Sequence, residues 1–107
     1  MSKVYKLFVL VLLSASTLLA QNYTISGTVT SSQTGENLVG ANVYVKNTTM
    51  GAATDVDGKY SIEVKAGRYT VICSYIGFET KQEIVDVSNN LELDFSLSDF
   101  AFSMSVE

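Results

Sequence analysis

Hydrophobic and polar residues alternate in short runs along most of this chain, and such alternation predicts β-strands. Successive side chains of a strand point to opposite faces of its sheet, so each run has one apolar and one polar face. The inner faces of the first three clear runs consist of Tyr23, Ile25, Gly27 and Val29, then Ala41, Val43 and Val45, then Tyr60, Ile62 and Val64. We expect these faces to form the core.

Four further segments complete the expected strands. Residues 51–54 predict a short strand with little to bury, and residues 68–75, 81–87 and 91–97 predict longer ones. Ala66-Gly67 predicts a hairpin turn into residues 68–75, and the turn at 88–90 predicts a hairpin between the last two strands. The expected fold is therefore all-β, a seven-stranded antiparallel Greek-key β-sandwich of the prealbumin or immunoglobulin-like type.

The sequence TDVDGKYSI at residues 54–62 combines an acidic turn with the start of a strand. Asp55 and Asp57 resemble the start of a calcium loop, but the twelfth position counted from Asp55 is Ala66, where an EF-hand needs a bidentate Glu. We expect Asp side chains to cap a turn that Gly58 closes with positive φ. Asp55 and Asp57 stay weak metal candidates, and no cofactor is expected.

The first 20 residues have the organisation of an export signal. Lys3 and Lys6 precede an apolar stretch at residues 7–13, and a segment rich in small residues ends at Ala20. The apolar stretch is shorter than the ~20 residues of a membrane span. We expect a signal peptide over 1–20, a domain over 21–98 that does not span the membrane, and a linker over 99–107, truncated before a further domain.

Composition argues against catalysis and against nucleic-acid binding. The chain has no histidine, so triads, Cys–His pairs and the usual zinc sites are excluded. Its formal net charge is −4, and its basic residues are scattered among carboxylates, whereas a nucleic-acid partner requires clustered Lys and Arg. The single cysteine, Cys73, lies at an inward strand position, so we expect a buried, inert thiol. The chain is not expected to be an enzyme.

Three aromatic residues, Tyr44, Tyr75 and Phe78, form the candidate binding surface. Aromatic rings stack on sugars and on peptide surfaces, so a glycan or a protein could bind there. The chain has no Trp, and a sugar platform needs coplanar rings, so packing of these rings within or between strands is the simpler expectation.

The order of the segments resembles one family. The stretches ISGTVT (25–30), SSQTGENLVGANVYV (31–45), TDVDGKYSI (54–62) and GRYTVICSYIGFET (67–80) are similar to the carboxypeptidase regulatory-like domain. The chain resembles the form of this domain that precedes the plug domain in TonB-dependent outer-membrane receptors of Bacteroidetes-type bacteria. The resemblance covers residues 23–97.

The resemblance implies a non-catalytic domain at the periplasmic face of the outer membrane, in a receptor that imports a nutrient. Its role would be interaction or coupling, and its partners would be the plug and barrel of the same receptor and periplasmic or outer-membrane proteins. The alternative from a different class is a self-contained, secreted or cell-surface module that binds carbohydrate or protein. The transported substrate is not encoded in this domain.

Overall fold

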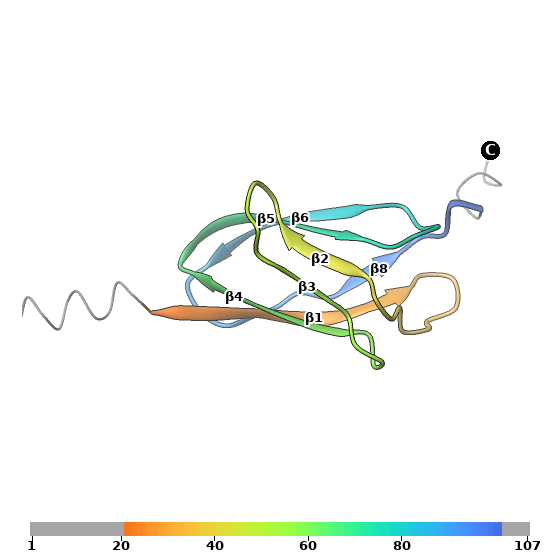
Figure 1. Cartoon of the computed structure of the whole chain (residues 1–107), viewed down its shortest axis with the longest axis horizontal. Coiled ribbons are helices and arrows are strands. Elements are labelled where there is room, and N and C mark those ends of the chain that lie inside the picture. Colours follow the sequence, from red (N-terminus) through yellow and green to blue (C-terminus); the bar gives the residue numbers. More distant parts are fainter. Residues whose placement is uncertain (1–20, 102–107) are drawn as a thin grey trace, which may run out of the picture.

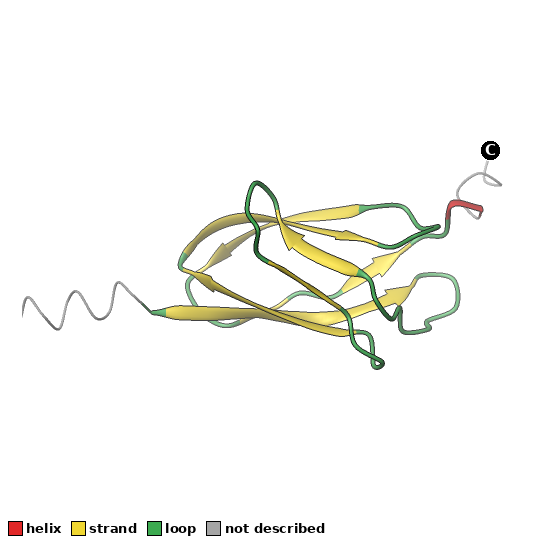
Figure 2. Ribbon diagram, in the orientation of Figure 1, coloured by secondary structure: helices red, strands yellow, loops and turns green. Residues whose placement is uncertain are grey.

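The computed structural model describes residues 21–101, which fold into two facing β-sheets (Figure 1). The predicted signal peptide, residues 1–20, and residues 102–107 of the predicted linker lie outside the described part of the chain. The strands of the described residues are β1 (Asn22–Ser31), β2 (Asn42–Val45), β3 (Gly51–Ala53), β4 (Lys59–Lys65), β5 (Gly67–Ser74), β6 (Lys81–Val87), β7 (Leu91–Glu92) and β8 (Phe95–Leu97). Figure 2 shows that strands and loops make up nearly all of this part.

The two sheets have separate strand orders. One sheet runs β4-β1-β7, with β8 also paired to β1, and the other runs β3-β2-β5-β6. The predicted all-β sandwich is therefore confirmed as a fold class. Lys59 and Lys65 lie on β4 and Lys81 on β6, which are edge strands of the described sheets, and charged side chains at such edges discourage pairing with other chains.

The core lies between the sheets and contains the inner faces that alternation predicts. Fourteen described hydrophobic residues are buried there: Ile25, Val29, Leu38, Ala41, Val43, Val45, Tyr60, Ile62, Val64, Val71, Cys73, Val87, Phe95 and Leu97. Tyr23, Leu91 and Leu93 pack against this cluster while partly exposed. Burial of aliphatic side chains at about 25 cal/mol per Å² is the main favourable term for a sandwich without disulfides.

The predicted hairpin between β4 and β5 is wrong. β4 pairs with β1, whereas β5 pairs with β2 and β6 in the opposite sheet. Only Ala66 separates the two strands, and a tight hairpin needs a loop of at least two residues. The chain therefore crosses from one sheet to the other at Ala66, and both strands keep their apolar faces toward the core.

The predicted hairpin between residues 81–87 and 91–97 is also wrong. β6 pairs with β5, and the last segment pairs with β1 in the other sheet, in parallel rather than antiparallel orientation. That segment is interrupted at Leu93 and Asp94, so the seventh expected strand is divided into β7 and β8. The described sandwich therefore contains eight strands and a parallel pairing.

Side chains that precede β7 and β8 accept hydrogen bonds from the backbone of β1. Thr24 N donates to Asn90 Oδ1 at 3.0 Å, and Thr28 N donates to Asp94 Oδ1 at 2.8 Å. Buried or partly buried backbone N–H groups need acceptors. Asn90 and Asp94 thus provide acceptors where the irregular strand does not supply backbone carbonyls. The N–H groups of Thr24 and Thr28 on β1 are therefore hydrogen-bonded.

Candidate interaction surface and acidic turn

The acidic turn lies between β3 and β4 and is organised by Asp55. The Asp55 carboxylate oxygen Oδ1 accepts hydrogen bonds from Asp57 N at 2.9 Å and from Lys59 N at 3.0 Å. The backbone closes the same turn, because Asp55 N donates to Lys59 O at 3.0 Å and Gly58 N donates to Asp55 O at 2.9 Å. One Asp55 carboxylate oxygen is therefore committed to the backbone of its own turn.

Two structural features require glycine at position 58. Its φ is +73°, in the left-handed region that L side chains rarely adopt. A Cβ at this position would also lie 2.9 Å from Asn37 Cβ and 2.9 Å from Val29 O. Gly58 O in turn accepts from Val29 N at 2.8 Å, so the turn is bonded to the end of β1. A backbone hydrogen bond thus attaches the turn to the sandwich.

Asp55 and Asp57 remain without a third ligand in the described structure. Within residues 21–101, no cluster of three or more His, Cys, Asp or Glu side chains is arranged to hold a metal ion. A calcium ion takes six to eight oxygen ligands. The geometry around Asp55 is that of a side chain that caps a backbone turn.

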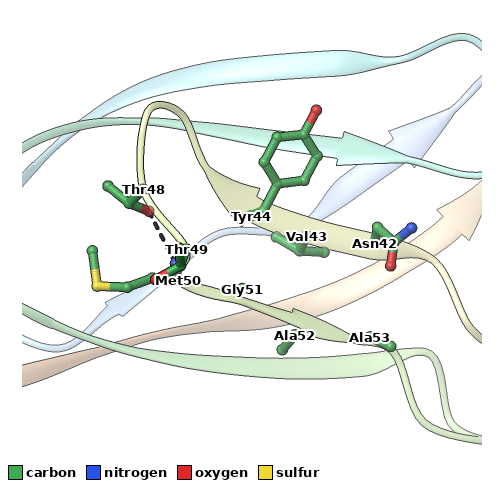
Figure 3. Close-up of a pocket in the computed structure, with 9 residues that line it drawn as sticks. All are labelled: Asn42, Val43, Tyr44, Thr48, Thr49, Met50, Gly51, Ala52 and Ala53. Carbon is green, nitrogen blue, oxygen red and sulfur yellow. Dashed lines mark hydrogen bonds between the residues drawn. The ribbon is translucent and has the colours of Figure 1, made fainter.

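The structure separates the three predicted aromatic residues into two places. Tyr75 and Phe78 pack edge to face, with ring centroids 5.5 Å apart and an interplanar angle of 62°. Tyr44 instead lines a shallow pocket of about 470 Å³ over β2 and β3, with Thr48 and Met50 among its neighbours (Figure 3). The three rings therefore do not form one coplanar platform.

A second depression, of about 440 Å³, contains the Tyr75–Phe78 pair. Its lining includes Phe100, which sequence reasoning assigned to the linker and did not place at a site. The sequence carried one signal for Phe100, a large apolar side chain three positions after Leu97, the last residue of the expected strand. Alternation alone cannot show which loop such a residue contacts.

The segment that leaves β8 is bonded to the loop between β5 and β6. Glu79 N donates to Ser98 O at 2.8 Å, and Phe100 N donates to Gly77 O at 3.0 Å. Phe78 and Asp99 form an isolated antiparallel bridge. Residues 99–101, expected to begin the linker, are thus attached to the domain, and the chain turns helical at Phe100 (Figure 2).

Two buried titratable groups lie in the core, away from these surfaces. Burial raises the pKa of the Cys73 thiol to about 11, and Cys73 is a free cysteine. Burial also raises the pKa of Tyr60 above its ordinary value, and its hydroxyl donates to Leu93 O. A raised thiol pKa disfavours the reactive thiolate, so the expectation of a buried cysteine is met.

Residues 25–106 match the family model of the CarboxypepD_reg-like domain. The match covers most of the chain, and the chain belongs to this family. The resemblance read from the strand and turn motifs is thereby confirmed. Within residues 21–101, the structure contains no helix with the length and apolar character needed to cross a bilayer.

Curated relatives of this chain are TonB-dependent receptors. It is 39% identical over 87 residues to TonB-dependent receptor P3 of Formosa agariphila, covering 81% of this chain and 9% of the receptor. It is 40% identical over 74 residues to TonB-dependent receptor SusC of Bacteroides thetaiotaomicron, covering 69% of this chain and 7% of the receptor. The chain thus spans less than a tenth of the length of these receptors.

Solved structures share the sandwich. A chain of a mutant type II cohesin–X–dockerin complex from Acetivibrio cellulolyticus aligns with a TM-score of 0.62 and 29% identity, over 72% of this chain and 58% of that chain. A DUF3823 family protein from Parabacteroides merdae aligns with a TM-score of 0.57 and 18% identity, over 76% of this chain and 48% of that chain. The second likeness concerns the fold alone.

Proposed function

We propose that this chain is the exported, non-catalytic N-terminal domain of a TonB-dependent outer-membrane receptor, and that it acts in interaction or coupling on the periplasmic side. The observation that carries the proposal is the sequence identity of 39–40% to two such receptors over most of the described domain. The plug and barrel of the same receptor are its expected partners, together with periplasmic or outer-membrane proteins.

The arrangement of the chain supports a spacing role. β1 begins at one end of the long axis of the sandwich, and the segment after β8 leaves at the other end (Figure 1). A domain that enters at one end and leaves at the other lengthens a polypeptide by its own long dimension. Such a domain would hold the end at which β1 begins away from the plug and barrel, within the periplasm.

The chemistry of the described residues supports a non-catalytic role. The chain contains no histidine for acid–base work. Cys73 and Tyr60 are buried, and burial raises the pKa of each above its ordinary value, so both groups stay protonated at neutral pH and well above it. Asp55, one of the two candidate metal ligands, instead accepts hydrogen bonds from backbone N–H groups of its own turn.

The alternative is a self-contained secreted or cell-surface module that binds carbohydrate or protein. The depression lined by Tyr75, Phe78 and Phe100 is the feature that favours it. The two functions differ in where the domain resides and in what it is attached to. A module of this kind would work without a barrel, and its loss would leave import through a receptor unaffected.

An in-frame deletion of residues 21–101 in the native gene tests the coupling role. Deleting the whole gene first identifies the nutrient whose use depends on the receptor. The domain deletion should then slow growth on that nutrient, while an antibody to the remaining protein detects wild-type amounts in the outer membrane. Undiminished growth at equal receptor levels would contradict a role in coupling.

A further inference from the structure

An apolar surface lies at the end of the sandwich where the chain leaves β8. The turn after β5 runs from Tyr75 to Phe78, with Phe78 N donating to Tyr75 O at 3.0 Å and Gly77 at φ +85°. This turn presents Ile76 at its tip, where the side chain is 91% exposed. Covering an aliphatic side chain so fully exposed is favourable, because it removes apolar area from water.

Phe100 extends the same surface from a different segment. It is 49% exposed and lines the depression together with Ile76 and the Tyr75–Phe78 pair. The other described lining residues are uncharged: Gly40, Asn42, Ser74, Gly77 and Thr80. The surface formed by Tyr75, Ile76, Phe78 and Phe100, here the exit surface, therefore combines contiguous apolar groups with neutral hydrogen-bonding groups, as cores of protein interfaces do.

The geometry favours a protein over a glycan as the occupant. A sugar ring stacks on a flat exposed aromatic face, but Tyr75 and Phe78 meet at 62° and each already packs against the other. The most exposed apolar group is the aliphatic Ile76, which offers no stacking face. Apolar side chains of a protein surface would cover both Ile76 and Phe100.

We infer that the exit surface docks the domain onto the folded part of the same receptor that follows it in sequence, an inference that rests on the proposed function. Phe100 belongs to the segment leaving the sandwich, and its N–H is bonded to Gly77 O of the turn. The polypeptide beyond Ala101 therefore starts at the exit surface. In the receptors that this chain resembles, more than nine-tenths of the length lies outside the matched stretch.

Covalent continuity makes this occupant the favoured one. Two surfaces on one chain meet at an effective concentration set by the linker between them, in the millimolar range for short flexible linkers, so a contact too weak for separate molecules is populated. Interfaces between domains of one chain bury about 600–1,500 Å² and are often polar at their rims. The exit surface supplies the apolar centre, and Asn42, Ser74 and Thr80 supply neutral polar groups beside it.

Site-specific photo-crosslinking in the native receptor tests the inference. Ile76 is replaced by p-benzoylphenylalanine in the receptor gene, cells are irradiated, and crosslinked peptides from the outer membrane are identified by mass spectrometry. The matched control carries the same group in place of Ile84, which is 61% exposed on β6, away from the depression. Both positions are exposed, so neither replacement disturbs the core.

The expected result is at least fivefold more intramolecular crosslinks from position 76 than from position 84, with partner peptides beyond residue 107. Crosslinks from position 76 to a separate polypeptide or to glycan, or no excess over position 84, would overturn the inference while the receptor assignment stands. Recovery of the domain only as a small protein unattached to a receptor would overturn the proposed function and this inference with it.

Discussion

Gly27 of β1 lies directly beneath the backbone of Leu93, and the position that a Cβ would take at Gly27 is 1.9 Å from Leu93 O. Leu93 N donates to Ser26 O at 2.7 Å, and the Tyr60 hydroxyl donates to Leu93 O. Leu93 directly follows β7, which ends at Glu92, and there the chain shifts toward β8. The close approach of two backbones thus requires glycine at position 27 and fixes the place where the last strand divides.

We expect Gly27→Ala to destabilise the domain by about 3 kcal/mol, because overpacking against a backbone carbonyl cannot be relieved by a side-chain rotation. Gly35→Ala is the matched control. Gly35 has φ +76°, but nothing lies within 4 Å of its Cβ position, so only the backbone cost of about 1–2 kcal/mol applies. Urea unfolding of residues 21–107 measures both. Equal losses would show that the Gly27–Leu93 contact relaxes freely.

Gly58→Val should destabilise the domain more than Asp55→Ala. The valine would combine positive φ with clashes against Asn37 Cβ and Val29 O, at a cost of about 3 kcal/mol. Asp55→Ala removes two hydrogen bonds to exposed backbone N–H groups, which corresponds to about 1 kcal/mol. Urea midpoints of the two variants decide the order. A midpoint for Gly58→Val equal to that of wild type would refute this reading of the turn.

Calcium should not stabilise the domain. Asp55 Oδ1 already accepts two backbone N–H groups, and the described residues provide no further acidic ligands around it. Thermal unfolding with excess calcium and with chelator should give midpoints that agree within about 2 °C, since a ligand stabilises only the state that binds it. A calcium-dependent rise of the unfolding midpoint by more than a few degrees would indicate that Asp55 and Asp57 are metal ligands.

Stability should fall above pH 9. Burial raises the pKa of Cys73 from 9.0 to about 11, so the folded state holds a proton that the unfolded state loses. The corresponding stability is fully present below pH 9 and declines as the pH rises through 11. Tyr60, whose pKa burial also raises, adds a decline that begins near pH 10.

Urea midpoints of wild type and two variants between pH 7 and pH 11 separate these contributions. Cys73→Ala should flatten the decline between pH 9 and pH 11, and Tyr60→Phe should flatten the part above pH 10. Each variant should lose stability at pH 7 as well, through lost packing or the lost bond to Leu93 O. Curves parallel to that of wild type would mean that neither group titrates differently in the folded state.

Alternation predicted the faces of the strands but not their neighbours. Val43, Ile62 and Val64 are buried as expected, because a period of two decides which side chains point inward. The same pattern suits a hairpin or a crossing to the opposite sheet, since both keep the apolar face toward the core. The chain makes such a crossing at Ala66. The local sequence does not specify which strand becomes the partner.

The candidate surface was predicted in part. Tyr75 and Phe78 lie together because only two residues of a turn, Ile76 and Gly77, separate them, and so short a separation can be read from the sequence. Tyr44 faces a different pocket, and Phe100 joins the surface from a distant segment. Contacts between segments so far apart depend on sheet topology, which the order of strands does not determine.

Amide hydrogen exchange on residues 21–107 should show protection at Glu79 and Phe100. Their N–H groups donate to Ser98 O and Gly77 O, so exchange requires opening of the contact between the loop after β5 and the segment after β8. We expect this protection to be weaker than that of β8, whose own residues Phe95 and Leu97 are buried. Exchange at the rate of an unstructured peptide at both amides would contradict attachment of residues 98–101 to the domain.

The central claim, residence in a receptor on the periplasmic side, is tested most directly by an epitope tag inserted between Thr48 and Thr49, in the exposed loop between β2 and β3. Native cells carrying the tagged gene are treated with protease before and after the outer membrane is opened. The account predicts a tagged outer-membrane protein far larger than 11.6 kDa, cleaved only after opening. A tag cleaved in intact cells, or carried by a small protein in the medium, would contradict it.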